Sequence, residues 1–119
     1  MNIQMIQILK QIQAMGYKIG PAETTVMVTS QDFTDPQRPH IATATNILQA
    51  QAKVYQDVLE AYLAVGAQFG LGGISDKISW YNQVGQPDTK AMILDTSWQP
   101  KPAYFALMEA LKNHLQSKA

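Results

Sequence analysis

The stretch GYKIGPAETTVMVTSQDF, residues 16–33, decides how the chain folds, because it can form a β-strand in two registers. Local propensity favours TTVMVT, residues 24–29, which is rich in valine and threonine and would leave Glu23 before the strand. The alternative strand YKIGPAE, residues 17–23, would end at Glu23. Parallel barrels carry their chemistry at the carboxyl ends of their strands. The second register therefore makes Glu23 a candidate catalytic residue, whereas the first makes it an ordinary exposed carboxylate.

Three amphipathic helices are expected around this stretch. Apolar residues recur at helical spacing before Gly16, which is well placed to end a first helix. A long apolar stripe predicts a second helix over residues 42–65, closed by Gly66. Pro102 suits the first turn of a last helix, whose stripe comprises Tyr104, Met108, Leu111 and Leu115. We expect Trp98 to pack inside, and we expect the helical methionines to fill the core or an interface: Met5, Met15 and Met108.

The run AQFGLGGIS, residues 67–75, is typical of a buried strand that leads into a loop. The order is then helix, strand, helix, strand, helix, which implies parallel pairing through right-handed crossovers. The sequence therefore predicts an α/β fold, with residues 1–119 forming a single domain. Two parallel strands do not make a stable sheet alone, and each leaves an open edge. We therefore expect that the chain is a piece of a larger α/β fold, or that other copies of the chain complete its sheet.

The composition narrows the class of protein. An apolar fraction of 46% with 15% charged residues is that of a folded chain. Nine basic and nine acidic residues balance, so neither nucleic acid nor a membrane is an expected partner. The chain has no cysteine, and His40 and His114 lack metal-ligand spacing, so we expect no metal and no cofactor. The first residues show no signal peptide, which predicts a cytoplasmic protein by default, or a secreted one if the chain is cut from a full-length enzyme.

Four stretches resemble motifs of one enzyme family. GYKIGPAETTV, residues 16–26, follows the pattern Gly-Leu-x-Val-x-Ile-Thr-Glu-Leu-Asp-Val. QAQAKVYQDVLEAYL, residues 49–63, has the Gln-Ala and Tyr signature of a barrel helix at Gln51, Ala52 and Tyr55. GGISDKISW is similar to Trp-Gly-x-x-Asp-x-x-Ser-Trp, matching at Gly73, Asp76, Ser79 and Trp80. With LDTSWQPKPAYFAL, residues 94–107, these motifs resemble glycoside hydrolase family 10, the endo-β-1,4-xylanases, which are TIM (β/α)8 barrels.

The resemblance implies a partial TIM barrel, roughly from helix 6 to helix 8, with Glu23 at the position of the catalytic nucleophile. A retaining glycosidase needs two carboxyl groups about 5–5.5 Å apart. The family's general acid/base glutamate lies on the fourth strand, which the matched region does not include. We therefore expect the chain to be inactive alone.

Three departures from the family pattern affect the expected site. Gly72 stands where the family has a tryptophan that forms an aromatic wall beside the scissile sugar. Thr24 and Thr25 replace the Leu-Asp that follows the nucleophile. Pro21 lies inside the strand that the family pattern predicts, where it removes one hydrogen-bond donor from the ladder.

Substrate-binding residues are expected near the second strand. Trp80 and Tyr81 can stack on sugar rings, although packing in an apolar gap is an equal alternative for Trp80. Asp76 would lie near Glu23 if both stand at strand ends. Two functions stay open. One is a xylanase fragment that acts on xylan or xylo-oligosaccharides once a complementary barrel fragment joins it. The other is a non-catalytic module that forms a homo-oligomer and binds glycan weakly.

Overall fold

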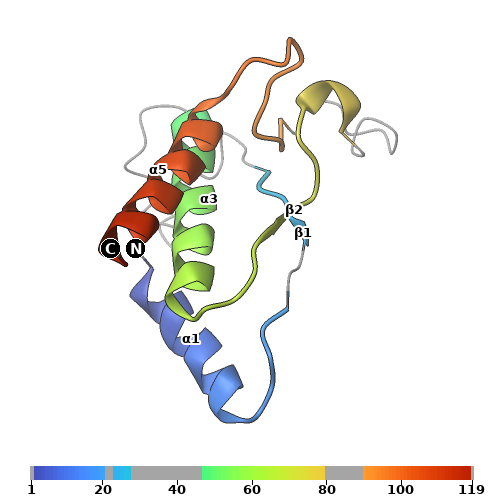
Figure 1. Cartoon of the computed structure of the whole chain (residues 1–119). Coiled ribbons are helices and arrows are strands. Elements are labelled where there is room, and N and C mark those ends of the chain that lie inside the picture. The colour runs from blue at the N-terminus through green and yellow to red at the C-terminus, as the bar shows by residue number, and fades with distance from the viewer. Residues whose placement is uncertain (1, 21–22, 28–46, 80–89, 119) are drawn as a thin grey trace.

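Three helices and a short strand pair make up the part of the chain that the computed structural model describes, which is residues 2–20, 23–27, 47–79 and 90–118. The elements are α1 (Ile3–Ala14), β1 (Glu23–Thr24), α3 (Ile47–Ala64), β2 (Gly70–Leu71), the 3-10 turn η2 (Asp76–Ile78) and α5 (Pro102–Ser117). Figure 1 shows the helices on one side of the strand pair, with α3 and α5 side by side. The predicted α/β class is confirmed. No helix within these ranges is long and apolar enough to cross a membrane.

The helix ends follow the local signals in the sequence. Asn2 caps α1, because its Oδ1 accepts a hydrogen bond from the Met5 N–H at 3.0 Å. Gly16 (φ 92°) and Gly66 (φ 71°) adopt the left-handed conformation just after α1 and α3 end. Pro102 begins α5. All three predicted helices are confirmed, and only residues 42–46, the predicted start of the second, lie outside the described residues.

The core lies where α3 and α5 face each other and the strands. On α3, Tyr55 and Leu59 are almost fully buried, and Leu107 of α5 packs in the same cluster. Ala103 and Ala110 of α5 are also buried there, and such small side chains let the two helices approach closely. Burial between these two helices is therefore the main apolar stabilisation of the described residues.

The strands pair in parallel, with Glu23 opposite Gly70 and Thr24 opposite Leu71. The Gly72 N–H donates to the Thr24 carbonyl at 3.0 Å. The prediction of a strand over residues 17–23 that ends at Glu23 is wrong, since the described residues 17–20 are unpaired and β1 begins at Glu23 and continues to Thr24. The register would set Gly20 opposite Ala67, where the chain has only just left the turn after α3. Residues 17–20 thus have no strand beside them on that side.

The two faces of the strand pair differ. Leu71 and Val26 pack against the core cluster, so the side of β1 that carries Thr24 and Val26 faces the helices. Side chains alternate along an extended chain, which turns Glu23 and Thr25 to the opposite face. Glu23 is accordingly exposed.

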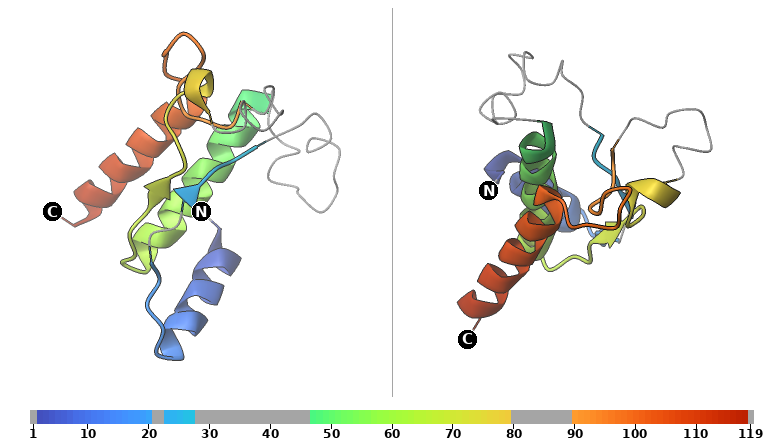
Figure 2. Two further views of the ribbon diagram at one scale, coloured as in Figure 1. Left: turned by 90° about the vertical axis from the view of Figure 1, so that its right-hand side faces the viewer. Right: turned by 90° about the horizontal axis from the view of Figure 1, so that it is seen from above.

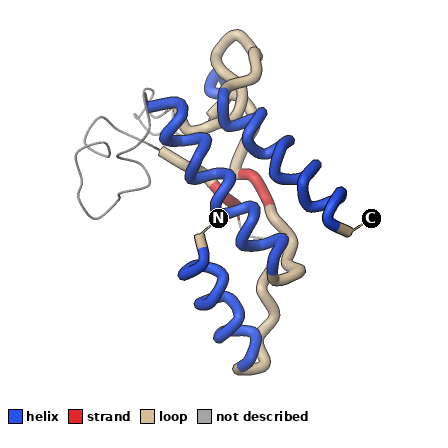
Figure 3. The backbone as a smooth tube through the Cα atoms, turned by 90° about the vertical axis from the view of Figure 1, so that its left-hand side faces the viewer, coloured by secondary structure: helices blue, strands red, loops and turns tan. Residues whose placement is uncertain are grey.

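Apolar side chains remain exposed on both flanks of the helix layer, where Figure 3 shows α1 and α5 on either side of α3. Met15 after α1 is 66% exposed and Met108 of α5 is 43% exposed, so neither is a core residue of the single chain. The prediction that Trp98 packs inside is also wrong, because it is 46% exposed. Asp95 Oδ1 accepts hydrogen bonds from the N–H groups of Ser97 and Gln99, and this tight turn holds Trp98 at positive φ on the surface.

Candidate functional site

Glu23 is the first residue of β1, and its carboxylate is exposed on the face of the strand pair that points away from the helices. Its register partner, Gly70, has no side chain, and neither has Gly72, two residues further along the same face. The Thr25 hydroxyl fills the space at Gly72. Glu23 presents its exposed carboxylate on the face of the strand pair that points away from the helices.

Asp76 is held in a buried ion pair with Lys101. The Lys101 Nζ lies 3.0 Å from Asp76 Oδ2, and the Met92 N–H donates to Asp76 Oδ1 at 2.8 Å. Lys101 also donates to the carbonyls of Met92 (2.6 Å) and Lys90 (2.7 Å). The pair thus joins η2, residues 90–92 and the start of α5. Substrate binding by Asp76 stays a prediction.

Burial lowers the pKa of Lys101 from its usual 10.5, although the hydrogen bond and charge of Asp76 act in the opposite direction. Between the lowered pKa and 10.5, the unfolded chain therefore holds a proton that the folded chain has released. Stability rises with pH wherever the unfolded state binds more protons.

We predict that the free energy of unfolding rises with pH across that window more steeply in the natural chain than in a Lys101→Met/Asp76→Asn double variant. Urea unfolding at several pH values below 10.5 measures this difference. The other lysines contribute equally to both proteins. Parallel pH profiles for the two would contradict the lowered pKa.

Two polar side chains of α3 hold the segment that follows Glu23. The Tyr55 hydroxyl accepts from the Val26 N–H at 3.3 Å and donates to the Ala91 carbonyl at 2.6 Å. The Gln51 side-chain amide donates to the carbonyls of Val26 (2.9 Å) and Lys90. Tyr55 and Gln51 thereby connect residues 23–27 and 90–91 to the helix α3. They fix the path of the chain directly after Glu23.

We predict that Tyr55→Phe lowers the free energy of unfolding by about 1–3 kcal/mol, because it leaves the buried Val26 N–H and Ala91 carbonyl without this partner. Tyr62→Phe on the same helix is the matched control, since Tyr62 is only half-buried, and should change stability much less. Urea unfolding of both variants measures the difference. Equal effects would show that the Tyr55 hydroxyl does not hold these segments.

Gly72, at the position where the family pattern has tryptophan, lies against Thr25. A Cβ atom on Gly72 would collide with the Thr25 hydroxyl, which occupies that space from the neighbouring strand segment. Similarly, a Cβ atom on Gly73 would lie 2.7 Å from the buried Met92 sulfur. A tryptophan therefore cannot be restored at position 72 unless Thr25 moves.

Sequence reasoning missed the role of Lys101, Gln51 and Tyr55. A usable signal was present for two of them, because Gln51 and Tyr55 interrupt an apolar helix stripe, and buried polar groups are almost always hydrogen-bonded. Lys101 gave no such signal, since lysine is usually exposed. The predicted sugar-stacking residues Trp80 and Tyr81 lie outside the described residues, and so does Pro21.

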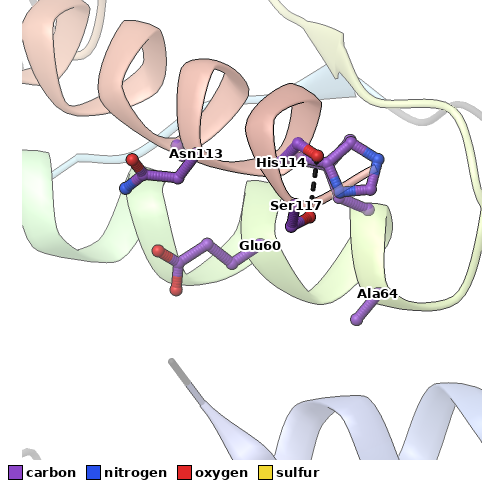
Figure 4. A pocket seen from close by; sticks show the side chains of 7 residues that line it. Glu60, Ala64, Asn113, His114 and Ser117 are labelled. Atoms are coloured by element: carbon purple, nitrogen blue, oxygen red, sulfur yellow. Dashed lines mark hydrogen bonds between the residues drawn. The ribbon is translucent and has the colours of Figure 1, made fainter. Parts of the chain in front are cut away.

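A hollow of about 250 Å³ lies between the later halves of α3 and α5. Figure 4 shows Glu60, Asn113, His114 and Ser117 around it, and the Ser117 hydroxyl donates to the His114 carbonyl at 2.8 Å. None of its lining residues comes from β1 or β2. Across the described ranges, no three acidic, histidine or cysteine side chains gather as a metal site. This hollow is separate from the face that carries Glu23.

Comparisons with known proteins point to xylanases. The sequence model of Glycosyl hydrolase family 10 matches residues 1–110. An endo-1,4-beta-xylanase B from Thermotoga neapolitana is 39% identical over 75 residues, which is 60% of this chain and 21% of that protein. Among solved structures, xylanase 10B from Thermotoga maritima superposes with a TM-score of 0.68 at 23% identity, over 94% of this chain and 32% of that one. A thermostable mutant xylanase from Cellvibrio japonicus superposes with a TM-score of 0.66 at 26% identity, over 89% of this chain and 34% of that one. The chain thus spans about a third or less of these relatives.

Proposed function

The chain belongs to glycosyl hydrolase family 10, and we propose that it supplies the nucleophile, without the general acid/base, of a retaining endo-β-1,4-xylanase. The observation that carries this proposal is the exposed carboxylate of Glu23, at the motif position of the family nucleophile and on the strand face away from the helices. The relatives described above, which are named xylanases, support xylan as the substrate.

The chemistry requires a second carboxyl group. In a retaining reaction, Glu23 would attack the anomeric carbon while the acid/base carboxyl protonates the departing glycosidic oxygen. The covalent glycosyl ester on Glu23 would then be displaced by water, whose proton goes to the same acid/base group. The bond between the Glu23 carboxylate and the anomeric carbon would form in the first step and break in the second.

The described carboxylates do not offer that second group. Asp57 and Glu60 lie on α3, and Glu109 lies on α5. Asp76 is engaged by Lys101, and Asp95 accepts hydrogen bonds from the Ser97 and Gln99 N–H groups of its own turn. A general acid/base must lie within reach of the glycosidic oxygen, opposite the nucleophile. We therefore assign the acid/base group to a complementary barrel segment, and we infer that the chain alone does not hydrolyse xylan.

Mixing tests this function directly. The chain is combined with the part of Thermotoga maritima xylanase 10B that it does not match, which carries the preceding strands, and the release of reducing sugars from xylan is measured. We expect hydrolysis from the mixture and none from either component. Hydrolysis by this chain alone would contradict the missing acid/base, and a stable mixture without hydrolysis would contradict the catalytic role.

A further inference from the structure

Residues 95–99 form a fixed turn just before α5. Besides the two hydrogen bonds that Asp95 Oδ1 accepts, the Trp98 N–H donates to the Asp95 carbonyl at 3.0 Å. The hydroxyl of Ser75, a fully buried residue directly before η2, donates to the same carbonyl at 2.8 Å. Both views of Figure 2 show the loop before α5 beside η2. The turn is therefore held by its own bonds and also anchored to a neighbouring segment.

This turn keeps Trp98 on the surface in an unfavourable backbone conformation. Its φ of 62° lies in the left-handed region, which residues with a side chain avoid, and the residue is 46% exposed. Among the described non-glycine residues, only Lys90 (φ 45°) shares this feature. Strained backbone of this kind gathers at ligand-binding and active sites. The segment 90–99 thus has the strain that is typical of a binding segment.

A hollow of about 420 Å³, which we call the turn hollow, lies on one flank of the turn. Ile47 and Leu48 of α3 and Pro100 give it apolar walls, and Lys90 and Thr96 contribute polar side chains. Its volume is within the range of roughly 300–1,000 Å³ that is usual for small-ligand sites. None of its lining residues comes from β1 or β2, so it is separate from the face that carries Glu23.

The charges around the turn hollow do not favour an ion. Its lining includes two acidic residues, Asp76 and Asp95, and two basic residues, Lys90 and Lys101, so the charges balance. Asp76 and Lys101 already form the buried ion pair. A neutral ligand with many hydroxyl groups fits these walls better, because its hydroxyls can bond to groups of either charge while its C–H groups lie against the apolar side chains.

Trp98 offers a flat apolar surface in the same turn. Its neighbours Thr96, Ser97 and Gln99 are also exposed and carry hydroxyl or amide groups. Such a surface suits a pyranose, whose C–H face can stack on the ring while its hydroxyls bond to the polar side chains. Thr96 lines the turn hollow and stands two positions before Trp98, so their Cα atoms are at most about 7.6 Å apart. One short oligosaccharide can therefore reach both.

We propose that the turn hollow and Trp98 form an accessory glycan site, which holds a β-1,4-linked xylose chain with one ring stacked on Trp98 and a neighbouring ring in the hollow. The identity of the sugar rests on the proposed function, whereas the geometry of the site does not. By holding the polymer, the site would raise the local concentration of xylan around the completed enzyme. All residues named for it belong to this chain, so binding does not require the complementary segment.

Binding of xylohexaose to the chain alone, measured by calorimetry, tests this site. Trp98→Gly is the informative variant, because glycine readily adopts the left-handed conformation and lacks the ring. We expect the affinity for xylohexaose to fall at least about tenfold, while the urea midpoint of unfolding is retained. A merely structural role of Trp98 would lower that midpoint.

Tyr17→Ala is the matched control. Tyr17 is another exposed aromatic residue (66%), and it follows the end of α1. Figure 1 shows the end of α1 at the opposite end of the molecule from the loop before α5. This variant should leave the affinity for xylohexaose unchanged.

Equal affinities for Trp98→Gly and the natural chain, or no binding by the natural chain, would overturn the proposal. Loss of folding in Trp98→Gly would also overturn it, because Trp98 would then be a packing residue. Full affinity in Trp98→Gly with a loss in Trp80→Ala would assign the sugar to Trp80 instead. A chain that binds xylohexaose, but whose completed assembly does not hydrolyse xylan, leaves this inference standing and removes only the proposed function.

Discussion

Replacing Lys101 with methionine should lower the free energy of unfolding by about 3–5 kcal/mol, because the Asp76 carboxylate would stay buried with its charge uncompensated. The same change also removes the donor to the Lys90 and Met92 carbonyls. Three segments that are distant in sequence would lose their common partner. Urea unfolding measures the loss, and limited proteolysis reports it if the variant has no folded baseline.

The second variant of this cycle is Lys101→Met combined with Asp76→Asn. It removes both charges and keeps an oxygen that can accept from the Met92 N–H. We expect it to recover part of the lost stability, since replacing both members of a buried pair costs less than removing one. Lys112→Met, at an exposed position of α5, is the control. It should change stability by no more than about 0.5 kcal/mol. Equal losses for Lys112→Met and Lys101→Met would show that the buried pair has no special role.

Glu23→Gln should lower the xylan hydrolysis of the completed assembly by about 10⁴-fold or more, because the amide cannot form the covalent glycosyl ester. Affinity for the complementary barrel segment should not change, since Glu23 is exposed and faces away from the helices. Glu109→Gln, at an exposed position of α5, is the matched control and should keep full activity. Hydrolysis within about tenfold of the natural assembly in Glu23→Gln would rule out Glu23 as the nucleophile.

The Glu23→Ala variant allows a test in which activity is regained instead of lost. With an aryl xyloside that has a good leaving group, azide can attack the anomeric carbon from the space that the carboxylate leaves. One displacement in place of two inverts the configuration, so the product should be the α-glycosyl azide. Rescue by azide in Glu23→Ala, together with none in Glu109→Ala, would identify the position as that of the nucleophile.

The helices could be predicted from the sequence because their signals are local. The periodic apolar stripes, Gly16, Gly66 and Pro102 act within one or two turns of the helix that they define. The position of Glu23 came from the family motif, and composition alone would have left it an exposed carboxylate.

The strand boundaries and the polar network could not be predicted in the same way. The start of strand pairing at Glu23 depends on where the chain becomes extended after α3. The family motif does not specify that position. Asp76 and Lys101 are 25 residues apart, so only the packing of η2 against the start of α5 reveals their contact. Trp98 was misplaced because its turn is defined by the backbone hydrogen bonds to Asp95, which outweigh the tendency of tryptophan to be buried.

Covalent trapping tests the central claim most directly. The chain, completed by the complementary barrel segment, is exposed to a 2-fluoro xylobioside that forms the glycosyl ester but resists its hydrolysis. The digested peptides are then analysed by mass spectrometry. We predict one adduct per chain, located on Glu23, and none in Glu23→Gln. A label on any other carboxylate, or no label in an assembly that hydrolyses xylan, would contradict the assignment of Glu23 as the nucleophile.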